Sequence, residues 1–530
     1  MKAGAQAPAA SGRSPRGGAA EDEAIAKALR SAADQHLQEG RFGAAIPLLR
    51  QLFERDPNDA KAQYALGAAL ARSGNAAEGL ACLQRAVARN HRDPAMRTEL
   101  GHAFFRLDRF REALGEADEA VALGDDSIHP RMLRVIALER LREFDQAQEA
   151  VDRVLQLSPG HADAVIIQAR LRRRTEDPTP SIELLRWIVT DTDSEEIRYR
   201  ALHELGMVLD HVGQYDEAFD AFVASGRART LTHEVRRYSL DVFPALIAAY
   251  AQAIERWSSI PAIDPSVLGQ STPAPAFLVG FPRSGTTLAE QVLAAHPQII
   301  TMEERPAVAM VRQALLAGAG TPAALADKLA TLTLDQAVAL RKRYWELAGS
   351  FGAKPSSTGL VLDKLPLNIV ELPLIARIFP ESRILIALRD PRDVCLSCFM
   401  QDFRLNEAMV HFLDWTRTAS LYASVMRLWL GVRNAIGNPW HEFRYEDVVA
   451  DFETSTREVL GFLGLPWDER VLRFDALAAT REIRTPSFQA VATAITSAAV
   501  GRWHNYPNAI ERIMPILGPL TANLGYLDPS

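Results

Sequence analysis

Residues 280–287 combine the residue types that a protein uses to hold a negatively charged group. They begin with the last residue of the apolar run AFLVG and read GFPRSGTT, with two glycines, one arginine and three hydroxyl side chains. An amphipathic helix is expected to begin at about Thr286, so backbone N–H groups and the helix dipole there favour an anion. The pattern therefore predicts a strand, a tight turn and a helix that together bind a phosphate-like group.

The glycine spacing is that of a nucleotide-binding phosphate loop, with four residues between Gly280 and Gly285. In nucleoside triphosphatases a lysine follows the second glycine and contacts the phosphates, and the next residue supplies a hydroxyl for Mg²⁺. Here Thr286 occupies the lysine position, Thr287 follows it, and Arg283 lies inside the loop. The loop can hold an anion but lacks the usual triphosphate clamp. A kinase or nucleoside triphosphatase stays open as an alternative, as does a turn without a ligand.

Two basic residues follow apolar runs of the kind that form buried parallel strands. Lys364 comes after GLVLD, Arg389 closes ILIAL, and Ser397 lies eight residues further on in a segment expected to be helical. In open α/β sheets, ligands bind beyond the carboxyl ends of the strands. We therefore expect both basic side chains at the edge of the sheet that also holds the phosphate loop. For Lys364 the alternative is a surface lysine beside Asp363.

The acidic pair Glu303 and Glu304, in the segment ITMEERPAV, is a candidate for proton transfer. A carboxylate positioned beside an acceptor hydroxyl can remove its proton and accelerate a transfer reaction by about 10²–10⁴-fold. The alternative is a solvated loop in which Arg305 is the ion partner of the pair.

The first half of the chain contains a 34-residue repeat. Similar phrases begin at four positions, and a small residue follows each by five positions: Gly40, Gly74, Asp108 and Arg142, then Ala45, Gly79, Ala113 and Ala147. Small residues let two helices approach closely, and apolar residues at helical spacing fill the space between neighbouring pairs. The period therefore predicts a stack of antiparallel helix pairs. The phrase GQYDEA continues it from Gly213, whereas residues 177–193 are degenerate.

The composition is that of an ordinary folded protein. The chain has 530 residues, of which 48% are hydrophobic and 24% charged, and a formal net charge of −7. Its length predicts two to four domains, and we expect neither a membrane span nor a secretory leader. Three cysteines cannot build a disulfide framework, which favours a reducing cytoplasm. The acidic balance argues against nucleic acid as the main partner.

Composition shifts along the chain predict four segments. Residues 1–22, rich in Ala, Gly, Ser and Pro, are expected to form a disordered tail. Residues 23–230 are expected to hold the helical repeats. Residues 231–274 are expected to form a helical bridge and a proline-rich linker. Residues 275–530 are expected to form the domain with the phosphate loop.

Taken in order, these motifs resemble two known families. The 34-residue helix–turn–helix period resembles the tetratricopeptide repeat. The segment PRSGTTL, followed by AAHP and the acidic pair, resembles the sulfotransferases, and most closely the tyrosylprotein sulfotransferases. The combination of the two resembles a bacterial group of sulfotransferases. The resemblance implies the fold class α + α/β, in which an N-terminal tetratricopeptide α-solenoid precedes a sulfotransferase domain with a parallel sheet and a P-loop-like turn.

The resemblance also implies the donor and the roles of individual residues. The donor is the co-substrate 3′-phosphoadenosine 5′-phosphosulfate, and no metal ion is expected, because sulfuryl oxygens carry less charge than a terminal phosphate. Glu304 is the general base, and Lys364, Arg283 and Ser487 stabilise the charge that develops during transfer. The residues implied to bind the donor are those of the loop, two for the 3′-phosphate and two later ones: Arg283, Ser284, Gly285, Thr286 and Thr287, then Arg389 and Ser397, then Tyr445 and Arg502. Tyr445 lies in the segment FRYEDVV, residues 443–449, which is expected to form a strand.

The implied function is transfer of a sulfuryl group to an acceptor hydroxyl. A protein tyrosine is one candidate acceptor, and a sugar, a lipid or a small phenol are others. The concave face of the repeats is a candidate surface for a protein or peptide acceptor, and relatives of this kind often form homodimers. A tetratricopeptide interaction scaffold with an inactive domain is a further alternative. We expect a cytoplasmic protein with no nucleic-acid and no membrane partner.

Overall fold

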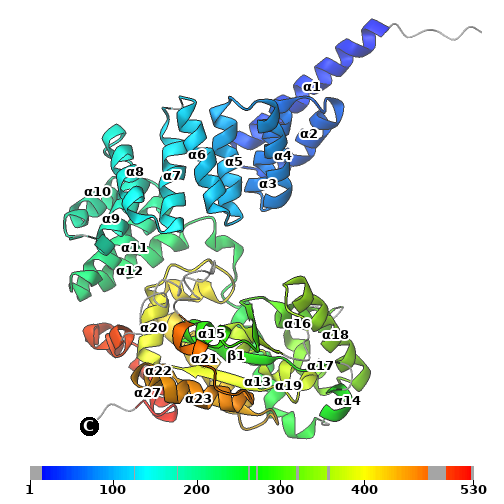
Figure 1. Ribbon diagram of the computed structural model, residues 1–530, viewed down its shortest axis with the longest axis vertical. Coiled ribbons are helices and arrows are strands. Elements are labelled where there is room, and N and C mark those ends of the chain that lie inside the picture. Colours follow the sequence, from blue (N-terminus) through cyan, green and yellow to red (C-terminus); the bar gives the residue numbers. More distant parts are fainter. Residues whose placement is uncertain are drawn as a thin grey trace, which may run out of the picture. The chain divides into compact units, whose positions relative to one another are not determined.

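The computed structural model of the chain describes residues 15–124, 126–175, 177–260, 263–269, 272–317, 322–354, 359–474 and 497–526. They form two compact units, Met1–Leu184 and Leu185–Ser530. The first is helical, and the second combines helices with one parallel sheet (Figure 1). Within the described ranges, no helix has both the length and the apolar character needed to cross a bilayer.

The first unit consists of antiparallel helix pairs whose turns follow the 34-residue period. The turn residues Gly40, Gly74, Asp108 and Arg142 have left-handed backbones, with φ of 70°, 103°, 59° and 63°. Glycine adopts this conformation without strain, and it ends a helix sharply. The helices are α1 (Pro15–Gln38), α2 (Phe42–Arg55), α3 (Ala60–Arg72), α4 (Ala76–Arg89), α5 (Pro94–Arg106), α6 (Phe110–Ala122), α7 (Ile128–Leu141), α8 (Phe144–Leu157) and α9 (Ala162–Thr175), and α10 (Pro180–Asp191) spans the division between the units.

The first helix begins earlier than the sequence suggested. α1 starts at Pro15, inside the range expected to form a disordered tail. Proline is favoured in the first turn of a helix, where its missing N–H would have no partner. The alanines and glutamates that follow are strong helix formers. Residues 1–14 of the expected tail lie outside the described residues.

The small residue of each repeat is required by the close contact between paired helices. A Cβ atom added at Gly79 would lie 2.6 Å from the backbone nitrogen of Ala71 and 2.7 Å from the carbonyl oxygen of Gly67. Real side chains do not approach a backbone so closely, because protein interiors are already packed as densely as crystals. α3 and α4 can therefore pack at this distance only with glycine at position 79.

Replacing Gly79 with valine is expected to destabilise the first unit by about 1–3 kcal/mol, because the added side chain forces α3 and α4 apart. The measurement is thermal unfolding of the full chain followed by circular dichroism. Gly115→Val is the matched control, since a Cβ at this helical glycine would meet nothing within 4 Å. Equal melting temperatures for the two variants would contradict the packing argument.

The second unit is built on a five-stranded parallel sheet. Its strands are β1 (Ala276–Gly280), β2 (Ile299–Glu303), β3 (Leu360–Lys364), β4 (Ile384–Leu388) and β5 (Trp440–Arg444), in the order β2-β3-β1-β4-β5. The chain runs from β1 outward to β2, returns to β3 and then crosses to the other side of β1. Ligands bind in such sheets at the carboxyl ends of the strands where the direction of winding reverses. That position is the turn after β1.

Helices make up the rest of the second unit. The longer ones are α11 (Glu195–His211), α12 (Tyr215–Thr230), α13 (Val242–Glu255), α15 (Thr286–Ala294), α16 (Ala307–Leu315), α18 (Leu334–Ser350), α20 (Pro391–Phe399), α21 (Trp415–Val432), α23 (Phe452–Leu463) and α27 (Met514–Asn523). The shorter ones are η1 (Val235–Arg237), η2 (Trp257–Ser259), α14 (Pro265–Gly269), η3 (Pro322–Ala324), α17 (Leu325–Ala330), η4 (Pro366–Ile369), α19 (Leu372–Ile378), η5 (Met409–Leu413), α22 (Tyr445–Ala450), η6 (Glu469–Arg473), η7 (Ser497–Ala499), η8 (Arg502–Asn505) and α26 (Pro507–Glu511).

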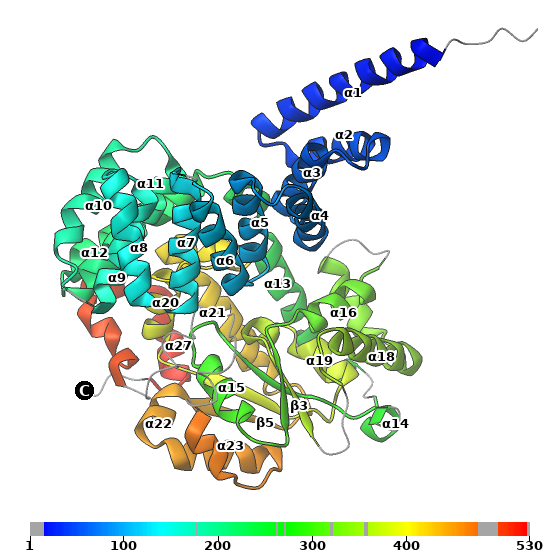
Figure 2. The same cartoon turned by 45° about the horizontal axis from the view of Figure 1, so that its top comes forward.

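Helices cover both faces of the sheet (Figure 2). On one face, Leu288 of α15 and Leu460 of α23 join the core that contains Leu278 of β1. On the other, the ring of Phe277 lies 6.2 Å from that of Tyr344 in α18. Neighbouring residues of β1 thus point into opposite layers, as the two-residue period of a strand requires. This burial on both faces fixes the position of the turn that follows β1.

The helix pair α11–α12 packs on the part of the second unit that carries the sheet. The ring of Phe219 lies 5.5 Å from those of Phe399 and Trp415. A Cβ at Gly226 would come within 2.2 Å of the carbonyl oxygen of Leu413, so α12 approaches η5 very closely. Tyr250 of α13, in the segment expected to be a bridge, is fully buried and hydrogen-bonds to a carboxylate of the same unit. Helices before the sheet therefore contribute to the core of the second unit.

Candidate functional site

The residues between β1 and α15 form a tight turn at the carboxyl end of the central strand. Arg283 and Gly285 have left-handed backbones, with φ of 70° and 100°. A Cβ at Gly285 would lie 2.9 Å from Cδ2 of Tyr445, so both the backbone and the available space require glycine there. α15 begins at Thr286, and the N–H groups of its first turn have no partners within the helix. The strand, turn and helix are arranged as the sequence predicted.

Two side-chain atoms at this turn are buried without a hydrogen-bond partner among the described residues. They are Oγ of Ser284, a residue that is 2% exposed, and Nε of Arg389, a residue that is 7% exposed. Leaving a buried polar group unpaired costs about 1–3 kcal/mol. Both atoms can donate a hydrogen bond, and oxygen atoms of an anion would satisfy them. These residues therefore fit a phosphate or sulfate group.

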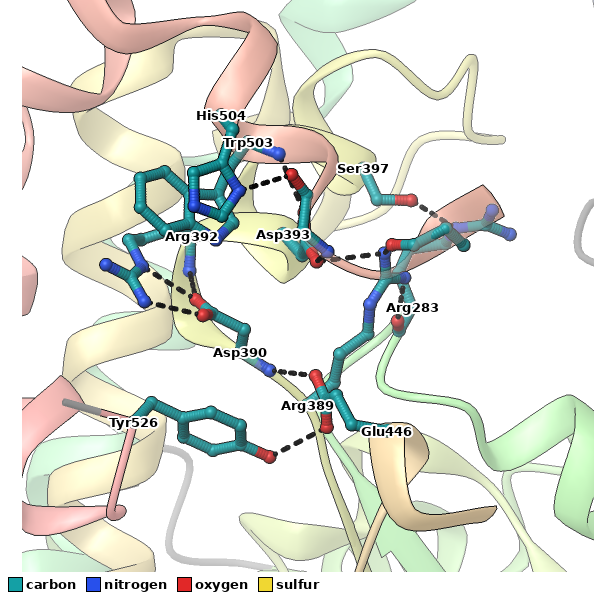
Figure 3. Close-up of polar contacts among 12 residues, drawn as sticks. Arg283, Arg389, Asp390, Arg392, Asp393, Ser397, Glu446, Trp503, His504 and Tyr526 are labelled. Carbon is teal, nitrogen blue, oxygen red and sulfur yellow. Dashed lines mark hydrogen bonds and ion pairs between the residues drawn. The ribbon is translucent and has the colours of Figure 1, made fainter. Parts of the chain in front are cut away.

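The arginine side chains around the turn reinforce this preference for an anion (Figure 3). Nε of Arg283 donates to Oγ of Ser397 at 2.9 Å, and Nη1 of Arg389 donates to the carbonyl oxygen of Arg283 at 3.1 Å. Burial lowers the pKa of Arg283, and the positive charges of Arg389 and Arg502 also act to lower it. Like charges at close range repel, and guanidinium groups bind phosphate oxygens well. A doubly charged anion would relieve the repulsion.

Asp393, which the sequence did not single out, attaches residues 501–503 to α20. Its carboxylate accepts hydrogen bonds from the backbone N–H groups of Gly501 at 2.8 Å and Trp503 at 2.9 Å. Arg392 lies over the ring of Trp503, 3.7 Å from the centroid, and forms a forked pair with Asp390 (Figure 3). The indole of Trp503 therefore packs against a neighbouring side chain. The sequence feature that could have indicated Asp393 is the segment RDPRD, in which this aspartate lies close to two arginines.

Arg502 reaches the helix pair α11–α12. Its guanidinium forms an ion pair with one carboxylate oxygen of Asp210, and the other oxygen accepts a hydrogen bond from Tyr506 at 2.5 Å. The side chain of Arg502 is 33% exposed. Asp210 and Arg502 are 292 residues apart in the chain, so no local pattern could have paired them.

On the other side of the turn, Lys364 lies between two carboxylates. Its Nζ is 2.8 Å from Oε1 of Glu304 and 2.8 Å from Oε2 of Glu290. The side chain of Lys364 has no exposed surface, so the alternative of a surface lysine is wrong. The guanidinium of Arg305 lies over the ring of Phe351, and the ion partner of Glu304 is Lys364.

Glu304 has an uncommon backbone conformation. It follows β2 directly and has φ of 43°, in the left-handed region that residues with side chains rarely occupy. Its N–H donates to the carbonyl oxygen of Lys364 at 2.8 Å, so backbone and side chain both contact the lysine. The Glu304 side chain is 37% exposed. Its carboxylate is thus held at the edge of the sheet and remains accessible to an incoming molecule.

Glu290 is, with Asp393, a site residue that the sequence-based prediction missed. It lies one helical turn after Thr286, and its side chain is 2% exposed. Burial raises the pKa of Glu290 to about 7, against the opposing effect of Lys364. The signal was the single charged residue in the helix TTLAEQVLAA, since a buried acid normally has an ion partner.

The other predicted site residues occupy different places. Tyr445 is not in a strand as predicted, because β5 ends one residue before it and Tyr445 begins α22. The guanidinium of Arg389 lies 5.0 Å from the centroid of the Tyr445 ring. Thr286 and Thr287 are buried at the start of α15. Ser487 lies outside the described residues.

Models of known protein families match segments in both halves of the chain. Residues 275–469 match the model described as sulfotransferase family. Residues 36–100 and 132–195 match models described as tetratricopeptide repeat. Both resemblances that the sequence motifs indicated are thereby confirmed.

Relatives of known name cover about half of the chain. Protein-tyrosine sulfotransferase 1 of Danio rerio is 24% identical over 269 residues, which are 48% of this chain and 72% of the relative. Protein-tyrosine sulfotransferase 2 of Gallus gallus is 26% identical over 268 residues, 48% of this chain and 69% of the relative. An uncharacterized protein of Aquifex aeolicus is 25% identical to this chain over 395 residues. These residues are 72% of this chain and 49% of the Aquifex protein, so the chain spans about half the length of that relative.

Proposed function

We propose that the protein transfers a sulfuryl group from 3′-phosphoadenosine 5′-phosphosulfate to an acceptor hydroxyl, because residues 275–469 match the model of the sulfotransferase family. The observation that carries the proposal is a pair of buried donor atoms beside the turn, Oγ of Ser284 and Nε of Arg389, that have no hydrogen-bond partner within the described part of the chain. The proposed donor carries two anionic groups, and charged oxygens are strong acceptors for such side chains. The arginines around the turn supply the matching positive charge.

The two ends of the donor need different partners. The turn residues, from Arg283 to Thr287, are assigned to the phosphosulfate, since they border the N-terminus of α15. Arg389 and Ser397 are assigned to the 3′-phosphate. Arg502 is assigned to the same end of the donor, and its ion pair with Asp210 limits where its guanidinium can lie.

The reaction moves one sulfuryl group and one proton. Glu304 takes the proton of the acceptor hydroxyl, and the acceptor oxygen forms a bond to sulfur. At the same time the bond between sulfur and the phosphate oxygen breaks, and its electron pair remains on the leaving phosphate. Lys364 and Arg283 stabilise this developing charge, and Ser487 stays a predicted further contributor. The catalysis thus depends on positioning and electrostatics, as in phosphoryl transfer.

The acceptor we propose is a tyrosine of a protein or peptide. The relatives named above are protein-tyrosine sulfotransferases, although at 24% and 26% identity. Tetratricopeptide repeats generally bind other proteins, and those of this chain offer a surface for such an acceptor. The homodimer and the cytoplasmic location remain predictions.

Thermal unfolding with two nucleotides tests the donor assignment. Adenosine 3′,5′-bisphosphate, the product left after transfer, is expected to raise the melting temperature, because a ligand at about 100 times its Kd adds about 2.7 kcal/mol. ATP, which lacks a 3′-phosphate, should have a smaller effect. Arg389→Ala should abolish the difference between the two nucleotides. Stabilisation by ATP alone would support the kinase alternative, and stabilisation by neither would support an inactive scaffold.

A further inference from the structure

The two carboxylates that contact Lys364 differ in what else they can reach. Glu304 is 37% exposed and can meet an acceptor, whereas Glu290 is 2% exposed and enclosed in the core. Both lie 2.8 Å from Nζ of Lys364. The general base role assigned to Glu304 leaves Glu290 without a function.

We propose that Glu290 is a positioning residue, which holds the ammonium group of Lys364 in place and keeps it charged while Glu304 accepts the proton of the acceptor. This inference rests on the sulfuryl transfer proposed above. Glu290 contacts neither substrate. It acts only through Lys364.

Electrostatics gives the reason why a second carboxylate is needed. Before transfer, Nζ of Lys364 has two carboxylate partners. When Glu304 takes the proton it becomes neutral, and its attraction for Lys364 weakens. A buried lysine without a carboxylate tends to lose its own proton, because burial disfavours the charged form. Glu290, still ionised, retains the charge on Lys364 at the moment when the leaving phosphate needs it.

The surroundings of Glu290 determine when it is ionised. The charged groups that face it are Lys364 and Asp363 at the end of β3, and Glu303 and Glu304 at the end of β2. Burial raises the pKa of Glu290 to about 7, Lys364 opposes this, and the two glutamates add to it. Glu290 is therefore mostly protonated below neutral pH and mostly ionised above it.

The test compares kcat of the wild type and of Glu290→Gln over a range of pH, with saturating donor and a tyrosine peptide. Glutamine mimics the protonated glutamate, so the two rates should be similar near pH 6, about one unit below the pKa of Glu290. Above about pH 8 the wild type should be about 10-fold faster, because a misplaced catalytic group loses much of its effect. KM for the donor should change little.

Two further variants separate this role from a structural one. Glu290→Asp keeps the charge and should restore part of the rate above pH 8, and it also serves if Glu290→Gln does not fold. Glu371→Gln removes another buried carboxylate, which pairs with Nε of Arg312 at 2.9 Å and not with Lys364. It should leave the pH dependence of the rate unchanged.

The possible outcomes distinguish this inference from the function on which it rests. Equal rates for the wild type and a folded Glu290→Gln at pH 8, or a rate ratio that does not change with pH, would overturn the positioning role alone. Absence of sulfuryl transfer by the wild type at every pH would overturn the proposed function, and the role of Glu290 with it.

Discussion

Replacing Glu304 with glutamine is expected to lower kcat by about 10²–10⁴-fold, the usual contribution of a general base. Glutamine has nearly the same size but cannot take a proton from the acceptor hydroxyl. The Glu304 side chain is 37% exposed, and Lys364 keeps Glu290 as a partner, so the variant should fold. The measurement is transfer of labelled sulfate from the donor to a tyrosine peptide.

Donor binding provides the control for this variant. Glu304 lies beyond β2, whereas most groups assigned to the nucleotide, Arg283 to Thr287 with Arg389 and Ser397, follow β1 and β4. Glu304→Gln should therefore retain the melting-temperature increase with adenosine 3′,5′-bisphosphate while losing transfer. A variant that transfers sulfate at nearly the wild-type rate would show that another group removes the proton.

Replacing Lys364 with methionine should lower kcat by about 10²–10³-fold, equivalent to about 2.7–4 kcal/mol of barrier. Methionine fills most of the buried volume but supplies no charge for the leaving phosphate. The substitution also leaves Glu290 and Glu304 without their shared cation. Because Lys364 lowers the pKa of Glu290, its removal should raise that pKa further above about 7.

This shift predicts how the stability of Lys364→Met depends on pH. A carboxyl group whose pKa is higher in the folded than in the unfolded state binds its proton more tightly when folded, so stability falls as pH rises. The variant should therefore lose more melting temperature relative to the wild type at pH 8 than at pH 5. Lys342→Met, at an exposed position of α18, should change neither rate nor stability. A loss of stability that is the same at both pH values would contradict the argument.

The repeat array was predictable because its determinants are local. Each turn residue of the 34-residue series ends one helix within a few residues. In every described pair of the series this residue has a left-handed backbone, which ends the helix. The small residue five positions later meets the neighbouring helix of its own pair at Gly79 and at Ala113. Such contacts repeat with the period of the chain, so the sequence alone reveals them.

The turn after β1 was predictable for a similar reason. The apolar run, the glycine and the helix start are consecutive in the chain, and together they form the predicted strand, turn and helix. The role of Tyr445 at this turn was not predictable in the same way. The sequence placed it in a strand, whereas β5 ends one residue earlier, because the backbone turns there into α22.

The amino-acid sequence by itself determined the repeat, the order of the apolar strands, and the presence of basic and acidic residues at the strand ends. Only the tertiary structure decided which of these charges meet. The register of β2 and β3 brings Glu304 to Lys364, α15 adds the buried Glu290, and α11 places Asp210 on Arg502. Charged side chains of opposite sign can pair in many combinations, and only the packing of helices on a sheet brings particular ones within ion-pair distance.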